Sequence, residues 1–239
     1  MTPHRAAFVD VDETLVSTNT LADLLAHLRP VPRSGRAEPA VGPLGSGNAR
    51  GALRRITISG APREEQDRAC YRLYAGQPVG AVAAAGREWF AAASHRPGFF
   101  HQPVLAALHD HRERGDLIVL VSASLGACLN PIARFVRADA VLCSAPAARA
   151  GVLTGEVDPL LAGAAKGAAV RGWMAEHGLP PADCHAYGDQ AGDLSMLLQV
   201  GHPVMVGTDQ VLAEYAERCD WRRLPGALQE PAGRLAIAS

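Results

Sequence analysis

Short apolar segments, separated by helical patterns, constrain the fold of this chain more than any other feature of its sequence. The clearest is residues 117–121, Leu-Ile-Val-Leu-Val, whose unbroken apolar run predicts a strand buried on both faces. Strands that alternate with helices pair in parallel, so the pattern predicts an α/β protein with a doubly wound parallel sheet. Four further strands are predicted at residues 6–9, 140–143, 184–187 and 204–206.

The predicted strands are unevenly distributed, because no strand pattern occurs between residues 15 and 101. Residues 20–28 and 62–93 have helical patterns, whereas residues 30–48 are rich in Pro, Gly, Arg and Ser and predict a loop. The chain is therefore predicted to have two parts, a core of residues 1–16 and 101–239 and a helical insert of residues 17–100.

Charge and composition argue against several functional classes. The 239 residues include 23 Lys and Arg against 24 Asp and Glu, so a nucleic-acid binder with a broad basic surface is not expected. No apolar stretch reaches the roughly 18 residues that a membrane span needs. The five cysteines are odd in number and form no Cys-x-x-Cys pair, which argues against a disulfide framework. With no signal-peptide pattern near residue 1, we expect a cytoplasmic protein.

The residues that come after three of these strands share one kind of chemistry. Because parallel strands present their carboxyl ends at one edge of a sheet, these residues are expected to converge there. Lys166 begins the helix before the fourth strand and is placed to reach the same edge. The three segments are residues 10–14 (Asp-Val-Asp-Glu-Thr), 122–124 (Ser-Ala-Ser) and 188–193 (Gly-Asp-Gln-Ala-Gly-Asp).

Crowded carboxylates repel one another unless a cation lies between them. Oxygen ligands suit Mg²⁺, which is commonly held by carboxylates together with a substrate phosphate. An ammonium and a hydroxyl would bind the remaining phosphoryl oxygens. This set of groups therefore favours phosphoryl transfer, in which an aspartate can also act as the nucleophile and a second aspartate as the general acid and base.

The four segments, in this order, resemble the motifs of the haloacid dehalogenase superfamily. The resemblance extends over residues 5–221 and is strongest to subfamily IB, the phosphoserine-phosphatase-like branch. It implies a Rossmann-like core in which the helical insert, residues 17–100, forms a cap. The matching segments are residues 10–14 for the first motif, 119–124 for the second, Lys166 for the third and 188–193 for the fourth, with further similarity at 151–155 and 200–204.

The resemblance implies a magnesium centre and a nucleophile among the acidic residues. Asp10 would be the nucleophile and a Mg²⁺ ligand. Asp12 would be the general acid and base, with its backbone carbonyl on the metal. Asp189 would be a further metal ligand. Dehalogenases of the superfamily lack an acid at the position of Asp12, so its presence favours a phosphatase.

Four other residues receive roles from the same resemblance, each beside a structural alternative. Ser122 and Lys166 would bind the transferred phosphoryl group; the alternatives are a helix N-cap for Ser122 and a solvated surface position for Lys166. Asp193 would hold a metal-bound water or orient Lys166, or else cap the following helix. Thr14 is expected to hydrogen-bond within the turn after the nucleophile.

The implied activity is a magnesium-dependent phosphatase that hydrolyses a small phosphomonoester through an aspartyl-phosphate. Phosphoserine is a doubtful substrate, because Asn19 stands where phosphoserine phosphatases have a Glu that contacts the substrate ammonium. Two alternatives stay open: a phosphotransferase that uses an alcohol as acceptor, and a non-catalytic member that binds a phosphorylated ligand or a partner protein.

Three other charged features are interpreted as solvated surface. Glu13 is expected to face outward, with no role assigned. Arg63, together with Arg68 and Arg72, fits an exposed helix face, although a contact with an anionic substrate group is the alternative. Residues 109–111, His-Asp-His, are interpreted as a solvated helix end, because residues two apart do not share a helix face.

Overall fold

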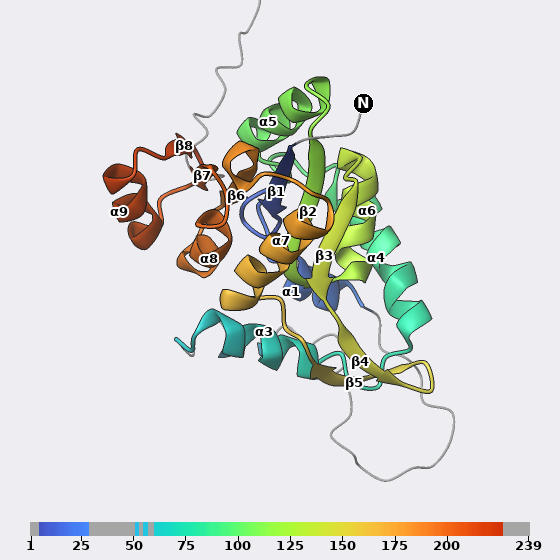
Figure 1. Cartoon of the computed structure of the whole chain (residues 1–239). Helices are drawn as coiled ribbons and strands as arrows, with labels where there is room; N and C mark the ends of the chain where they lie inside the picture. Colours follow the sequence, from blue (N-terminus) through green and yellow to red (C-terminus); the bar gives the residue numbers. More distant parts are fainter. Residues whose placement is uncertain (1–4, 29–50, 53–54, 57–59, 227–239) are drawn as a thin grey trace, which may run out of the picture.

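The computed structural model describes residues 5–28, 51–52, 55–56 and 60–226; the predicted loop at 30–48 lies outside these ranges. Six strands form one sheet in the order β3-β2-β1-β6-β7-β8, and every neighbouring pair is parallel (Figure 1). The doubly wound, Rossmann-like fold is therefore confirmed. Its strands are β1 (Ala6–Asp10), β2 (Leu117–Leu125), β3 (Ala140–Ser144), β6 (His185–Gly188), β7 (His202–Val206) and β8 (Arg222–Leu224).

Helices cover both faces of the sheet. Because successive side chains of a strand point to opposite faces, each buried strand contributes to an apolar cluster on both sides. In β1, Ala7 and Val9 belong to one apolar cluster, and Ala6 and Phe8 belong to the other. The first cluster includes residues of α1 (Thr20–His27), α4 (Val79–Ala93), α5 (Gln102–Glu113) and α6 (Gly126–Val136). The second includes residues of α7 (Ala164–Glu176), α8 (Leu194–Leu197) and α9 (Gln210–Arg218).

The structure differs from the expected pattern of elements at three places. The sheet has six strands rather than five, because β8 was not predicted; it is a three-residue edge strand, Arg-Arg-Leu, without an apolar run. Helix α9 was also not predicted. The helical pattern at 62–93 forms two helices, α3 (Arg63–Arg72) and α4, which are separated at Gly76, where φ is +82°.

Helix α3 lies across the carboxyl ends of the strands, beside a two-stranded antiparallel hairpin of β4 (Pro146–Arg149) and β5 (Val152–Val157) (Figure 1). Backbone hydrogen bonds join the segment after α3 to the hairpin: Gly76 N donates to Leu153 O at 2.8 Å, and Leu153 N donates to Gln77 O at 2.9 Å. Helix α4 of the same insert packs against α6 instead. The insert therefore contributes both to the core and to the edge of the sheet where the predicted site lies.

All five cysteines are free thiols, and three of them, Cys70, Cys128 and Cys184, are buried. Within the described residues, every helix is too short or too polar to cross a membrane.

Candidate active site

The sheet brings the predicted acidic residues to one edge. Asp10 is the last residue of β1, which lies between β2 and β6, so the segments after β1 and β6 are neighbours. Asp189 follows the last residue of β6, and Asp193 ends the short helical turn after it. Gly188 permits this arrangement, because a Cβ at that position would lie 2.5 Å from the Cβ of Asp193.

Lys166 occupies the centre of the acidic group. Its Nζ donates hydrogen bonds to Asp10 Oδ1 at 2.5 Å and to Asp193 Oδ1 at 2.6 Å, and all three residues are buried. Burial lowers the pKa of a lysine, but the carboxylates of Asp10 and Asp193 more than offset this, and the net pKa of Lys166 is raised. The ammonium is therefore charged at neutral pH. It is not the solvated surface group of the alternative interpretation.

Asp193 has a structural role in addition to its contact with Lys166. Its Oδ2 accepts hydrogen bonds from the backbone N–H groups of Asp189 at 3.2 Å and Gln190 at 3.4 Å. One oxygen therefore caps the turn after β6 while the other holds Lys166. The predicted cap of the following helix, α8, does not form, because the Asp193 side chain bonds to the turn before it instead.

Thr14 contacts a different part of the site from the one that was predicted. Its hydroxyl donates to Asp189 Oδ1 at 2.7 Å and does not bond within its own turn. The turn after β1 directs this side chain across the sheet edge toward the segment after β6, a contact between residues far apart in the sequence. Thr14 therefore holds the carboxylate of Asp189 in place.

The carboxylates outnumber the cations at this edge. Burial, followed by the neighbouring charge of Asp193, raises the pKa of Asp10, even though Lys166 opposes the shift. Burial and the charge of Asp10 likewise raise the pKa of Asp189. Both shifts show that the charged forms of these carboxylates are disfavoured unless another cation is present.

The residues present fit a divalent cation. Carboxylate oxygens of Asp10, Asp189 and Asp193 lie within 4.8 Å of one another. Among the described residues, none donates a hydrogen bond to Asp10 Oδ2, which is buried. Such an atom is costly to bury without a partner, and a hard ion would supply one. A set of oxygen donors alone favours Mg²⁺ over softer metals.

Ser122 lies on β2, the neighbour of β1 opposite β6, and Asp12 lies two residues after Asp10. Asp12 Oδ1 accepts a hydrogen bond from Thr20 N at 2.9 Å. Burial raises the pKa of Asp12, and hydrogen bonds from Thr20 oppose the shift. Ser122 Oγ accepts from Ser124 N at 3.0 Å. Ser122 is not a helix N-cap, because β2 continues through it and α6 begins only at residue 126.

A cavity of about 540 Å³ opens over these groups, with the first turn of α3 on its opposite wall. Arg63 lines it and lies 3.4 Å from Glu13 Oε2 and 3.5 Å from Asp67 Oδ1. The prediction for Arg63 was therefore wrong, because Arg63 faces the cavity. Glu13 is exposed, as predicted, and pairs with Arg63. The spacing of Arg63 and Asp67, four residues apart, was the one available signal, but it occurs on many exposed helices.

Asn19 is the N-cap of α1, and its side-chain oxygen accepts a hydrogen bond from Ala22 N at 2.9 Å. It also lines a smaller cavity, of about 130 Å³, together with Arg63 and Asp67. Burial is the main cause that raises the pKa of Asp67, to about 6. Asn19 thus combines a capping role with a position beside the larger cavity, with which the small one shares Arg63 and Asp67.

Comparison with known proteins agrees with this geometry. The profile of haloacid dehalogenase-like hydrolases matches residues 7–198. The chain belongs to this family. A protein of Mycobacterium tuberculosis named as a probable phosphatase is 30% identical over 225 residues, which are 90% of this chain and 73% of that protein.

Solved structures share the fold. A Bordetella pertussis protein of unknown function has a TM-score of 0.74 at 23% identity, and the match covers 93% of this chain and 99% of that one. A substrate-bound phosphoserine phosphatase has a TM-score of 0.65 at 19% identity, and the match covers 90% of each chain. Family membership makes this chain a hydrolase, with phosphatases among its named relatives.

Proposed function

We propose that this protein is a magnesium-dependent phosphatase that hydrolyses a small phosphomonoester through an aspartyl-phosphate on Asp10. The observation that carries the proposal is the buried contact of one ammonium, Lys166, with two carboxylates, beside a third carboxylate close enough to share an ion. A phosphoryl group has the charge and the oxygens to complete this arrangement.

In the first step a carboxylate oxygen of Asp10 attacks phosphorus, and the bond from phosphorus to the ester oxygen breaks. Asp12 donates its proton to the departing alkoxide, which leaves as an alcohol. The raised pKa of Asp12 favours the protonated form that this step needs. Lys166 and Ser122 neutralise and orient the phosphoryl oxygens during the transfer.

In the second step a water molecule attacks the phosphorus of the aspartyl-phosphate. Asp12, now a carboxylate, accepts a proton from this water, and the bond between phosphorus and Asp10 breaks. Inorganic phosphate leaves, and both aspartates return to their starting protonation states. Hydrogen bonds from Thr20 stabilise the charged form of Asp12 that serves as the base.

Asp10, Asp189 and the backbone carbonyl of Asp12 would hold the Mg²⁺ ion. Bound there, the ion would offset the excess of carboxylate charge and the negative charge of the phosphoryl group. Thr14 and Asp193 support the site through their hydrogen bonds to Asp189 and its backbone.

We further propose that residues 17–100 act as the cap over this site, with α3 as the wall that meets the leaving group. The cavity between α3 and the sheet edge has the size of a small-metabolite site. Asn19 makes phosphoserine a poor candidate, because a neutral amide whose oxygen already accepts a hydrogen bond replaces an acid. The partner is therefore a small phosphomonoester other than phosphoserine.

The test is hydrolysis of p-nitrophenyl phosphate and of a panel of phosphorylated metabolites, with Mg²⁺ and with EDTA. We expect release of phosphate only with the metal. The Asp12→Asn variant, quenched in acid after mixing with substrate, should carry the mass of one phosphoryl group on the peptide that contains Asp10. Activity in EDTA, or transfer of the phosphoryl group to an added alcohol in place of water, would contradict the proposal.

A further inference from the structure

Thr20 is buried at the first turn of α1 and makes two polar contacts, of which the mechanism above uses only the one with Asp12. Its backbone N–H donates to Asp12 Oδ1 at 2.9 Å. Its hydroxyl donates to Ser124 Oγ at 2.7 Å. Thr20 is fully buried, so water does not compete for either contact.

The second contact continues to the phosphate-binding side of the site. Ser124 N donates to Ser122 Oγ at 3.0 Å, and Ser122 and Ser124 are both buried. A serine hydroxyl has one proton and two lone pairs. Because the N–H of Ser124 takes one lone pair of Ser122 Oγ, the hydroxyl proton is left to donate elsewhere, and a phosphoryl oxygen in the cavity is a suitable acceptor.

We propose that Thr20 is a positioning residue that aligns the general acid and base with the phosphate-binding hydroxyl. A single hydrogen-bonded chain runs from Asp12 through Thr20 and Ser124 to Ser122. One end, Asp12, lies in the turn after β1 and the other, Ser122, lies in β2, and Thr20 is the residue that joins them. This inference rests on the proposed phosphatase function.

The surroundings of the chain keep it rigid. Cys128 Sγ, from α6, donates to Thr20 O at 3.4 Å, and Tyr71 of α3 donates to Ala123 O at 2.9 Å. Helix α1 is therefore fixed at its first residue from one side, and the end of β2 that carries Ser122 and Ser124 is fixed from the other. A side chain that is locked by such contacts can hold reacting groups within the small tolerances that catalysis needs.

The test compares Thr20→Val, which keeps the shape but removes the hydroxyl, with Thr20→Ser, which restores it. With Mg²⁺ and p-nitrophenyl phosphate, Thr20→Val should lower kcat about 10-fold, the effect of one buried hydrogen bond, with KM changed less than about 2-fold. Thr20→Ser should stay within about 3-fold of the wild-type kcat. Because Ser124 acts through the same chain, Ser124→Ala combined with Thr20→Val should be no worse than Thr20→Val alone.

Leu24→Ala is the matched control. Leu24 also lies on α1 and is buried, but its apolar side chain takes no part in the hydrogen-bonded chain from Asp12 to Ser122. The control should lower the melting temperature at least as much as Thr20→Val does while kcat is unchanged. Equal losses of kcat in both variants, or additive losses in the double variant, would overturn the proposal.

A crystal structure of Thr20→Val separates this proposal from the proposed function. If the wild-type protein hydrolyses no phosphomonoester, the proposed function is wrong, and the positions of the side chains decide about Thr20. A changed rotamer of Ser122 or Asp12 supports a positioning role. Side chains that stay in place in the variant overturn it.

Discussion

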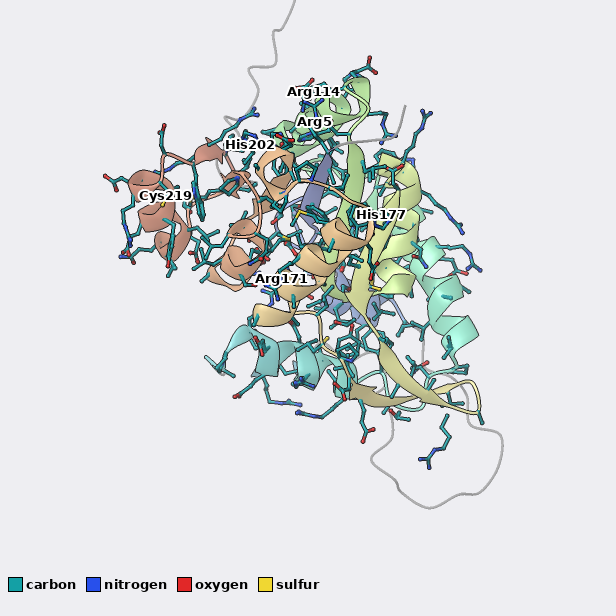
Figure 2. The ribbon with its side chains drawn as sticks, in the orientation of Figure 1. Arg5, Arg114, Arg171, His177, His202 and Cys219 are labelled. Carbon is teal, nitrogen blue, oxygen red and sulfur yellow. The ribbon has the colours of Figure 1, made fainter. Side chains whose placement is uncertain are left out.

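Two buried charged clusters lie at opposite ends of the sheet, and they are built differently. At the carboxyl edge, Lys166 contacts Asp10 and Asp193. At the amino edge, Asp116 is surrounded by hydrogen-bond donors: Arg5 Nε lies 2.8 Å from Oδ1, and His111 Nδ1 lies 2.8 Å from Oδ2. Figure 2 shows Arg5 and Arg114, which also reaches Asp116, at the end of the molecule away from α3.

The pKa of the acids shifts in opposite directions in the two clusters. Burial opposes ionisation of Asp116, but the hydrogen bonds from His111 and Arg5 outweigh it and hold its pKa below the usual value. At the carboxyl edge burial and neighbouring carboxylates raise the pKa of Asp10 and Asp189. Hydrogen-bond donors offset the charge of Asp116 at the amino edge, whereas at the carboxyl edge the carboxylates outnumber the cations that contact them. We therefore expect the reactive site at the carboxyl edge, where the buried charge is not offset, and not at the amino edge.

The largest expected effect is on the nucleophile. Asp10→Asn removes the attacking oxygen and should lower kcat at least about 10³-fold with Mg²⁺, since loss of a nucleophile removes the covalent route altogether. The kcat is measured in a steady-state assay with p-nitrophenyl phosphate, and a circular dichroism spectrum verifies that the variant is folded. A folded Asp10→Asn protein with wild-type activity would refute the contrast between the clusters.

Loss of a metal ligand should come next. Mg²⁺ in large excess over its Kd should raise the melting temperature of the wild-type protein by about 5 °C, because the folded site binds the ion and the unfolded chain does not. In Asp189→Asn this shift should disappear and activity should fall at least about 100-fold. In EDTA the variant should melt above the wild type, because one of the crowded carboxylates is gone. The measurement is the melting temperature of the wild type and of Asp189→Asn, each with Mg²⁺ and with EDTA.

The two clusters should also give opposite pH dependences of stability in metal-free protein. The folded-state pKa values of Asp10 and Asp189 are raised above the usual 3.8, so their contribution to stability is present at low pH and is lost as the pH rises through those values. At the amino edge the ring of His185 lies against that of His111, with centroids 4.5 Å apart. Burial, with His111 and His202 nearby, lowers the pKa of His185 to about 4, so its contribution is lost as the pH falls from 6.5 toward 4.

Urea denaturation in EDTA across pH 4 to 9 should therefore show two falling limbs. We expect the free energy of unfolding to decrease by about 2 kcal/mol on the alkaline side, and by about 1 kcal/mol on the acid side because His185 is only partly buried. Mg²⁺ should flatten the alkaline limb alone, and His185→Gln the acid limb alone. An alkaline limb that Mg²⁺ leaves unchanged would show that the acidic cluster is not the metal site.

The smallest effect is expected at the amino edge. Tyr187 OH lies 2.8 Å from His111 Nε2, and both side chains are buried. Tyr187→Phe should lower the free energy of unfolding by about 1 kcal/mol, the cost of one buried hydrogen bond, and leave kcat within about 2-fold. A loss of activity larger than this would connect the two clusters, contrary to the distinction drawn between them.

The sheet and the convergence of the acids were predictable from the sequence. The apolar runs give the strands, and the parallel order places residues 10, 122 and 189 at one edge without further information. The positions of Asp10 and Asp189 follow from that rule, whereas that of Lys166, on α7, was expected only from its place before the fourth strand and from the family resemblance. Their catalytic roles stay predictions.

The features that were missed depend on contacts between distant segments. The hydroxyl of Thr14 meets Asp189, and Arg63 reaches Glu13 from the insert. His111, interpreted as part of a solvated helix end, has 1% exposure, because α5 turns it inward to Asp116 and Tyr187. Neighbouring residues in the sequence do not specify such partners, so motif spacing identified the reacting groups but not the residues that hold them.

The backbone hydrogen bonds between the segment after α3 and the hairpin have a consequence for turnover. Arg68 of α3 also donates to Val157 O, so helix and hairpin are joined along their length. Any opening that admits substrate or releases phosphate by displacing α3 must carry β4 and β5 with it. Small molecules can therefore enter and leave fastest if only side chains at the cavity entrance move. Release of a bulky product would need the slower joint movement of α3 and the hairpin.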